Sequence, residues 1–449
     1  MAASIDSRMD LPRDSEFPAD LSPLAWVQEE LRRSLESVHK TLRRLLRDGD
    51  QRGSSFSALG GEPASGAGHG PLTAAAAQLH QVTGVLSLVG LPAGATLLRA
   101  AETAVLRLAQ SPQSVEPAVV DLIEQADFAL LSYVARLLAG NKASALALFP
   151  AYRALQTWNG VDRIHPADLW PQEFSWRALP LEETSPALAP ESLRGAFETA
   201  LLRQMRQPGP QPASQLSDLC AALAAAHSEM QVRCLWQLAA AQFQAQALGL
   251  LPPDTYAKRL GSRLLSQLRA GGVPSQRLAQ DLLFFCARAQ VPAPGQAPRL
   301  EAVRQSYGLA AESVGDYEDD SLGRIDPAWV SQAKRRVSVA KDSWSSAAEG
   351  ENHRLAGLDE QFAALAESLG RLFPSGEVLG QTLQRAVVAT LRSGQAPRPD
   401  LAMEVATCLL YVEAALEDAA FDQPEQAERV RQLARRVESV AHGEAPAPL

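Results

Sequence analysis

Residues 72–91 read LTAAAAQLHQVTGVLSLVGL, and the spacing of their apolar residues sets the fold class of this region. At about 100° per residue, apolar side chains at steps of three and four gather in one stripe along a helix. That stripe contains Leu72, Ala75, Leu79, Val82, Leu86 and Val89. The segment therefore predicts an amphipathic helix over 72–89, which the following Gly90 and Pro92 bring to an end.

His80 lies on the side of this helix that faces away from the apolar stripe, and Gly84 follows one turn later on the same side. A glycine inside a helix costs about 1 kcal/mol relative to alanine, so its presence calls for a reason. One reason is that the missing side chain lets another protein approach the imidazole closely. Two other interpretations stay open: His80 is an ordinary surface histidine, and Gly84 serves helix packing or bending within its own bundle.

The composition of the whole chain favours helices. Alanine, leucine, glutamine and arginine dominate the 449 residues, only 6% are aromatic, and alternating β-branched runs of strand length are almost absent. With 46% hydrophobic residues the chain can build several cores, and its length fits two to four domains. We therefore predict an all-α protein in which an antiparallel four-helix bundle is followed by two further helical bundle domains.

Stretches rich in proline, glycine or acidic residues divide the helical pattern. Within the first bundle, a Gly/Ser-rich loop over 49–71 connects the first two helices. The predicted organisation is a disordered tail over 1–20, a four-helix bundle over 21–140, a Trp/Pro-rich connector over 141–190, a second helical domain over 191–312, an acidic linker without core-forming residues over 313–325, a third helical bundle over 326–442 and a tail over 443–449. Asp326 and Pro327 supply the N-cap and first helical position of the third bundle.

Other candidate residues give weaker signals. His165 and Asp168 are two metal-ligand types close together, but a site needs at least a third ligand. His227 falls on the apolar stripe of one long helix that also contains Leu216 and Cys234, which predicts a buried core histidine. The four cysteines are far apart within apolar runs, so we expect small buried side chains in a reducing compartment.

Charge and motif content exclude several function classes. The net charge of −9 argues against nucleic-acid binding as the main role. No stretch has the apolar length of a membrane span, and the first residues lack the apolar core of a signal peptide, which predicts a cytoplasmic protein. No nucleotide-binding glycine motif, nucleophile elbow or zinc-protease motif occurs in a suitable context. We therefore predict a protein that is not an enzyme and needs no cofactor or metal.

The segment around His80 resembles histidine phosphotransfer (Hpt) domains, whose motif is histidine, two residues, lysine and glycine. His80 and Gly84 match the histidine and the glycine, and Gly90-Leu91 resembles the usual helix end, but Thr83 stands at the lysine position. A threonine hydroxyl offers a neutral hydrogen bond where lysine would place a positive charge. The resemblance implies an Hpt-like bundle, a candidate phosphoacceptor at His80, and docking of a response-regulator receiver domain on His80, Thr83, Gly84 and Ser87.

A more extensive resemblance covers nearly the whole chain. Its segments are similar to the N-terminal region of ChpA/PilL-type chemotaxis-like hybrid histidine kinases and to the related FimL scaffold proteins. These segments are DLSPLAWVQEELRRSLE (20–36), QLHQVTGVLSLVGL (78–91), RIDPAWVSQAKRRVSVAKDSW (324–344) and PDLAMEVATCLLYVEAALED (399–418). The resemblance implies two-component signalling in the control of type IV pili and twitching motility, with a receiver domain and a polar scaffold protein as partners and a polar, peripheral location.

Three functions follow from these observations. The leading one is a non-catalytic scaffold with a degenerate Hpt-like domain that docks a receiver domain on the His80 side. The second is genuine histidine phosphotransfer through His80 as part of a hybrid histidine kinase. The third is a purely structural module that spaces domains or forms a homodimer.

Overall fold

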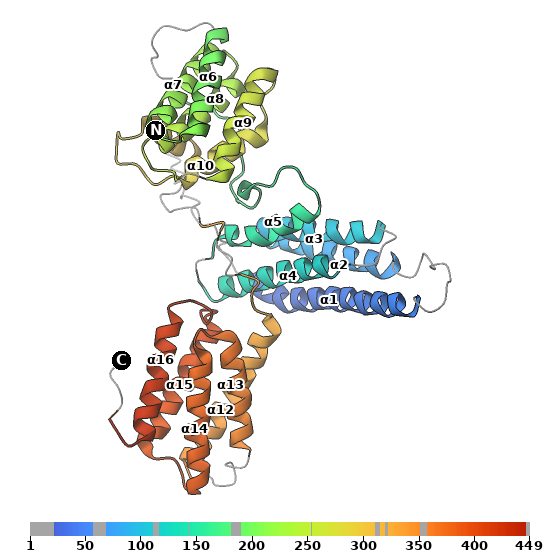
Figure 1. Ribbon diagram of the computed structural model, residues 1–449, viewed down its shortest axis with the longest axis vertical. Helices are drawn as coiled ribbons and strands as arrows, with labels where there is room; N and C mark the ends of the chain where they lie inside the picture. Colours follow the sequence, from blue (N-terminus) through green and yellow to red (C-terminus); the bar gives the residue numbers. More distant parts are fainter. Residues whose placement is uncertain are drawn as a thin grey trace, which may run out of the picture. The chain divides into compact units, whose positions relative to one another are not determined.

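The computed structural model describes residues 22–56, 69–110, 116–141, 143–180, 190–252, 254–309, 315–318, 322–350 and 357–445. Over these residues the chain forms α-helices and two short 3₁₀ helices and no β-strand, so the predicted all-α class is confirmed (Figure 1). No helix in this part of the chain has the length and apolarity that crossing a bilayer requires. Contacts divide the chain into two compact units, built mainly from residues 162–316 and from residues 20–143, 147–161 and 317–449.

The N-terminal bundle, in the second of these units, consists of α1 (Ser22–Phe56), α2 (His69–Leu88), α3 (Pro92–Gln110) and α4 (Pro117–Leu138). α1 packs against α2 and α4, and α3 packs against the same two helices, which closes the bundle. Leu79 and Leu86 are fully buried, as the stripe on α2 predicts. Val89-Gly90-Leu91 joins α2 to α3, and Gly90 takes a left-handed backbone conformation with φ 81°.

Two segments of this region differ from the sequence prediction. Residues 49–56, predicted as the start of a loop, continue α1 as helix, because glycine lowers helix stability by only about 1 kcal/mol and does not forbid the conformation. The remainder of that loop, 57–68, lies outside the described residues, as do the tail 1–20 and most of the tail 443–449. The predicted connector contains the 3₁₀ helix η1 (Ala145–Leu148) and the helix α5 (Phe149–Trp158), and α5 packs against α3 and α4.

The predicted linker 313–325 also contributes to a core. Tyr317 is buried, and its ring meets that of Phe149 edge-on with 5.7 Å between centroids. The expectation that this acidic stretch lacks core-forming residues is therefore wrong where the structure describes it. The acidic composition of this stretch predicts an exposed linker, whereas its one aromatic residue, Tyr317, packs against the first bundle.

The other unit contains the 3₁₀ helix η2 (Pro166–Asp168) and six α-helices. These are α6 (Pro190–Arg206), α7 (Pro210–Ala226), α8 (Met230–Ala247), α9 (Thr255–Ala270), α10 (Gln276–Arg288) and α11 (Pro298–Tyr307). α8 lies at the centre, in contact with α7, α10 and α11. The carboxylate of Asp254 accepts hydrogen bonds from the first turn of α9, and the Ser275 hydroxyl does the same for α10, so both helices start at side-chain caps.

His227 is not a core histidine. The long helix predicted through this residue is interrupted: α7 ends at Ala226, His227 is its exposed C-cap in an extended conformation, and α8 begins at Met230. No proline or glycine marks this break, so the apolar period continues across it and predicts one helix instead of two. The four cysteines, in contrast, are buried and free as predicted, and burial raises the pKa of the Cys286 and Cys408 thiols to about 12.

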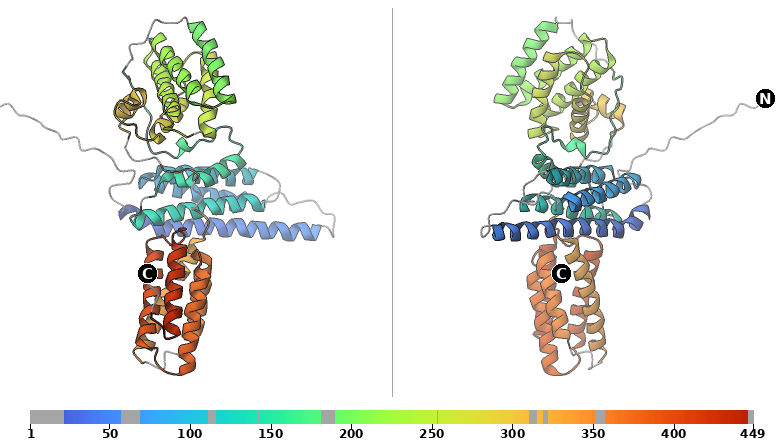
Figure 2. Two further views of the ribbon diagram at one scale, coloured as in Figure 1. Left: turned by 60° about the vertical axis from the view of Figure 1, so that its left-hand side comes forward. Right: turned by 90° about the vertical axis from the view of Figure 1, so that its right-hand side faces the viewer.

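The C-terminal bundle consists of α12 (Pro327–Ala348), α13 (Leu358–Leu372), α14 (Gly376–Ser393), α15 (Pro399–Glu417) and α16 (Gln426–Ala441), which lie side by side in Figure 2. They form a closed ring in the order α12, α13, α14, α16, α15 and back to α12. Asp326 caps α12 and Pro327 occupies its first turn, as predicted. At Gly380 an added Cβ would come within 2.7 Å of the Ala366 Cα, so α13 and α14 approach closely there.

A buried polar pair joins α1 to α4 in the N-terminal bundle. His39 Nε2 lies 2.6 Å from Asp127 Oδ2, and the Asp127 side chain is fully buried. Burial disfavours the charged imidazole, but the hydrogen bond and negative charge of Asp127, together with Glu124 and Asp326, outweigh it and raise the pKa of His39. For Asp127, burial disfavours the charged carboxylate and therefore raises its pKa, against the opposing effect of His39.

This pair predicts a specific pH dependence of stability. A histidine whose pKa is higher in the folded than in the unfolded state stabilises the fold fully below its unfolded pKa, near 6.5, and loses that contribution as pH rises through the folded value. His39→Gln should therefore lower the unfolding free energy most at pH 6, by about 1–3 kcal/mol. Thermal unfolding of wild type and variant between pH 6 and 9 checks this. A difference in melting temperature that stays constant over this range would contradict it.

Candidate functional site

His80 lies on the surface of α2 and is held by a carboxylate of α3. Its side chain is 75% exposed, and Nδ1 lies 3.1 Å from Oε1 of Glu102. A carboxylate only accepts hydrogen bonds, so Nδ1 is the donor in this contact, and in the neutral tautomer that donates from Nδ1 the lone pair is on Nε2. Nε2 makes no hydrogen bond to the part of the chain that the structure describes. His80 therefore faces solvent, as the apolar stripe of the helix predicts.

Gly84 leaves open surface beside this imidazole. A Cβ added at Gly84 would meet nothing within 4 Å. At Gly94, a glycine of α3, the added atom would come within 2.8 Å of the Leu130 side chain. Packing inside its own bundle therefore explains Gly94 and does not explain Gly84.

Thr83 does not belong to the exposed face, which corrects part of the predicted docking set. Its side chain is buried, and its hydroxyl donates a hydrogen bond to the Leu79 carbonyl at 2.9 Å within α2. The position three residues after His80 turns toward the neighbouring helix, so the Hpt lysine position is closed to solvent here. Ser87 is exposed, and its hydroxyl donates to the Thr83 carbonyl at 3.0 Å.

Sequence reasoning missed the contribution of α3. α2 and α3 form an antiparallel hairpin, and the contact of His80 with Glu102 sets its register. One turn along, this register places the exposed Arg99 at the level of Thr83. The pairing could have been found by counting outward from the turn at Gly90. We call the resulting surface the α2–α3 face; it comprises His80, Gly84, Ser87 and Leu88 of α2 and Arg99, Glu102 and Leu106 of α3.

The α2–α3 face combines apolar and polar groups in a way that suits protein contact. Leu88 is 88% exposed and Leu106 39%. By the hairpin register the two leucines lie about 18 Å apart at opposite ends of the face, with the imidazole and the guanidinium between them. α2 itself contains neither lysine nor arginine, so Arg99 is the cation that the hairpin register brings nearest to the histidine turn.

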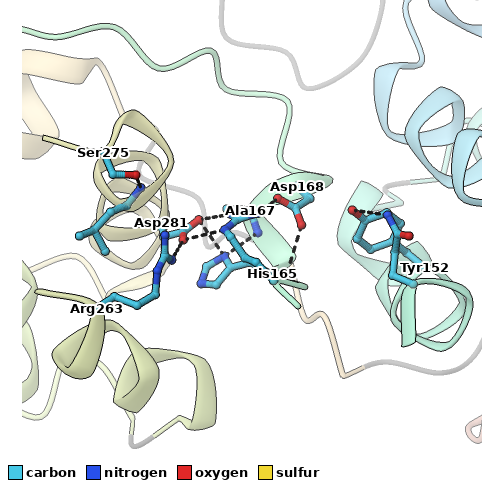
Figure 3. A network of polar contacts seen from close by, with 10 residues as sticks. Tyr152, His165, Ala167, Asp168, Arg263, Ser275 and Asp281 are labelled. Carbon is cyan, nitrogen blue, oxygen red and sulfur yellow. Dashed lines mark hydrogen bonds and ion pairs between the residues drawn. The ribbon is translucent and has the colours of Figure 1, made fainter. Parts of the chain in front are cut away.

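His165 and Asp168 belong to a polar cluster in the other unit, drawn in Figure 3. The fully buried carboxylate of Asp281 on α10 is paired with two guanidiniums, Arg163 with nitrogen–oxygen distances of 2.5 and 3.3 Å, and Arg263 of α9. Arg163 also donates to Asp168 at 2.6 Å. Burial opposes the charge of Arg163, but the hydrogen bonds and negative charges of Asp281 and Asp168 raise its pKa.

The protonation of His165 fits a structural role for this cluster. Burial first, and the positive charge of Arg163 second, lower the pKa of His165 to about 3. The neutral ring accepts a hydrogen bond at Nδ1 from the Ala167 backbone N–H at 3.1 Å, so its approach to Asp281, at 3.3 Å, is not an ion pair. Among the described residues, no group of three or more potential ligands gathers that could hold a metal. The cluster ties the 163–168 segment to α9 and α10.

Comparison with known protein families finds a match for part of the chain. Residues 182–320 match the family model of the FimL scaffold protein second domain. The matched span contains α6–α11, and it covers less than half of the 449 residues. No curated protein and no solved structure matches the chain. The match supports a scaffold role of the FimL type for this part of the protein, and it includes Arg263 and Asp281 but not the α2–α3 face.

The Asp281 cluster predicts a large effect of a small substitution. Asp281→Asn keeps the size of the side chain but leaves Arg263 without its carboxylate and Arg163 with Asp168 alone, which should destabilise this unit by about 2–3 kcal/mol. Hydrogen exchange measured by mass spectrometry on the full chain should show faster exchange in α9 and α10. The matched control is Asp218→Asn, because Asp218 pairs with Arg299 at the surface and is 69% exposed. Equal exchange in the two variants would contradict the structural role of the cluster.

Proposed function

We propose that the chain is a non-catalytic signalling scaffold and that its α2–α3 face docks the receiver domain of a response regulator. The observation that carries the proposal is the open surface at Gly84 beside an exposed imidazole. A glycine in mid-helix is unfavourable, and here no contact within its own bundle requires it. The match of residues 182–320 to a scaffold domain supports a role in bringing proteins together.

The pathway and further partners come from the resemblance of the other segments. Similarity to ChpA/PilL-type and FimL proteins favours the chemosensory system that controls type IV pili and twitching motility. A polar scaffold protein would then be a second partner, and the protein would act in the cytoplasm at the cell pole. Nucleic-acid binding has no support in a chain with a net charge of −9.

Docking at Gly84 is tested by adding a side chain there. Gly84→Arg should raise the dissociation constant for a purified single-domain receiver at least tenfold, which is about 1.4 kcal/mol of binding free energy. The reason is that the arginine side chain would occupy the space where the receiver domain would contact α2. Isothermal titration calorimetry with the full chain and a panel of receivers from type IV pilus systems provides the measurement. Thermal unfolding should change little, since the new side chain meets no neighbouring atom.

The matched control for this experiment is Gly195→Arg. Gly195 lies in mid-helix in α6, is exposed, and has no atom within 4 Å of an added Cβ. This variant should bind receivers as the wild type does. Receiver binding that survives Gly84→Arg, or that both variants reduce equally, rules out docking on the α2–α3 face.

A second candidate function is phosphotransfer through His80, and the contact with Glu102 favours it. In that reaction the lone pair of Nε2 attacks the phosphorus of a phosphorylated receiver, an N–P bond forms, and the aspartate carboxylate leaves with the P–O electron pair. Glu102 would hold the proton on Nδ1 and support the positive charge that the ring gains. Arg99, in place of the absent lysine, would supply the cation near the phosphoryl oxygens.

Radiolabel transfer separates this function from docking alone. A phosphorylated receiver should transfer label to the wild type, to His227→Gln, which alters another exposed histidine, and not to His80→Gln. Glu102→Gln should slow labelling without abolishing it, because the amide oxygen still accepts the Nδ1 proton but adds no charge. A wild type that stays unlabelled while an ordinary Hpt domain is labelled excludes phosphotransfer and leaves the docking proposal untouched.

A further inference from the structure

A cavity of about 290 Å³ opens between α6, α8 and α9, and we call it the α6–α8–α9 cavity. Four of the residues that line it are at most 4% exposed: Leu201, Phe243, Leu251 and Ala257. Because core side chains form its walls, the hollow reaches into the apolar interior of this unit. Its volume is close to the lower end of the range for ligand pockets, about 300–1,000 Å³, so a ligand that fits it is small.

The packing around the α6–α8–α9 cavity keeps it open. At Gly261 on α9, an added Cβ would come within 2.6 Å of Cδ1 of Leu201 on α6, so these two walls already touch. The rim contains Pro208, Pro210 and Pro252, whose rings fix the backbone φ angle of the two loops. Since the helices are in contact and the loops are stiff, the hollow is a fixed part of the fold.

The polar groups that line this cavity leave a cation available but no carboxylate. Asp254 caps the first turn of α9 with its carboxylate and lies 3.7 Å from Arg288, so its charge is already compensated. Lys258 is exposed and makes no ion pair or hydrogen bond with the described residues. The other polar side chains of the lining, Gln204 and Gln246, are neutral. An ammonium beside an apolar hollow favours a ligand that has a negative group and an apolar chain.

A second cavity in the same unit lacks this combination. It has a volume of about 170 Å³ and lies between α7, α8 and α11, and its cation is Arg299. The guanidinium of Arg299 lies 2.8 Å from the carboxylate of Asp218 and donates to the Ser217 hydroxyl at 2.7 Å. This cavity therefore offers apolar surface without an available charge, and it predicts no preference for an anion.

We propose that the α6–α8–α9 cavity binds a small amphiphilic anion, whose carboxylate pairs with Lys258 and whose apolar chain fills the hollow. At about 30 Å³ per non-hydrogen atom, the share of one molecule in liquid water, the cavity holds about ten such atoms. A straight-chain carboxylate of eight carbons has this size. The proposal goes beyond receiver docking and does not depend on it.

Isothermal titration calorimetry of the full chain with octanoate tests this proposal. One site with a dissociation constant of roughly 0.1–1 mM is expected for a ligand of about ten non-hydrogen atoms. Octan-1-ol has the same chain without the charge and should bind the wild type at least fivefold more weakly. Lys258→Gln should weaken octanoate binding at least fivefold and leave octan-1-ol binding unchanged, because the substitution removes the ion pair and keeps the hollow.

Ala257→Leu fills the cavity from its wall. It should lower the affinity for octanoate at least tenfold, and the melting temperature should not fall, because the added carbons occupy empty space. The matched control is Ala225→Leu, which adds the same atoms beside the second cavity. Arg277→Gln, which removes an exposed cation on α10 outside the cavity, is the control for Lys258→Gln. Both control variants should bind octanoate as the wild type does.

Three results would overturn the proposal. They are octanoate that fails to bind at 10 mM, binding that Lys258→Gln and Ala257→Leu both leave intact, and octan-1-ol that binds the wild type as tightly as octanoate. If Ala257→Leu melts below the wild type, the two ligands measured on Lys258→Gln still decide the question. Gly84→Arg should bind octanoate like the wild type, so failure of receiver docking and failure of this site are told apart.

Discussion

Burial of the apolar stripe on α2 is the constraint from which the candidate site follows. Because Leu79 and Leu86 are fully buried, the rotation of α2 about its axis is fixed. This rotation determines which of the remaining residues of α2 face solvent and which face the core. His80 reaches solvent because it lies opposite the stripe. Thr83 turns inward because it comes four residues after Leu79, a rotation of about 400°, so its side chain lies about 40° from that buried leucine.

Buried charged groups add positional information that apolar packing lacks. Leucine and alanine cores tolerate sliding of one helix past another by a turn, whereas a carboxylate with a single complementary partner does not. Asp127 meets His39 on α1, and Asp281 holds two arginines from separate segments. Each pair is costly to bury and costlier still to break, so it favours one alignment of its helices over alternatives.

Features set by local spacing could be predicted from the sequence, and features set by distant contacts could not. The stripe of α2, the cap at Asp326 and the outward position of His80 follow from residues within a few turns of one another. Asp281 and Arg163 are 118 residues apart in the sequence, and no local sequence pattern predicts that they pair. The break at His227 was missed for a related reason, because the apolar period runs on through residues that carry no helix-breaking signal.

The inward position of Thr83 also decides whether this bundle could carry the full Hpt motif. On paper, one substitution to lysine would complete the spacing of histidine, lysine and glycine. In the folded bundle the side chain of that lysine would start between two packed helices, where its charge is poorly solvated. Exposing the ammonium would require α2 to rotate, and rotation would expose the leucines that hold the bundle together. A solvated lysine at position 83 and the present packing of this bundle therefore exclude one another.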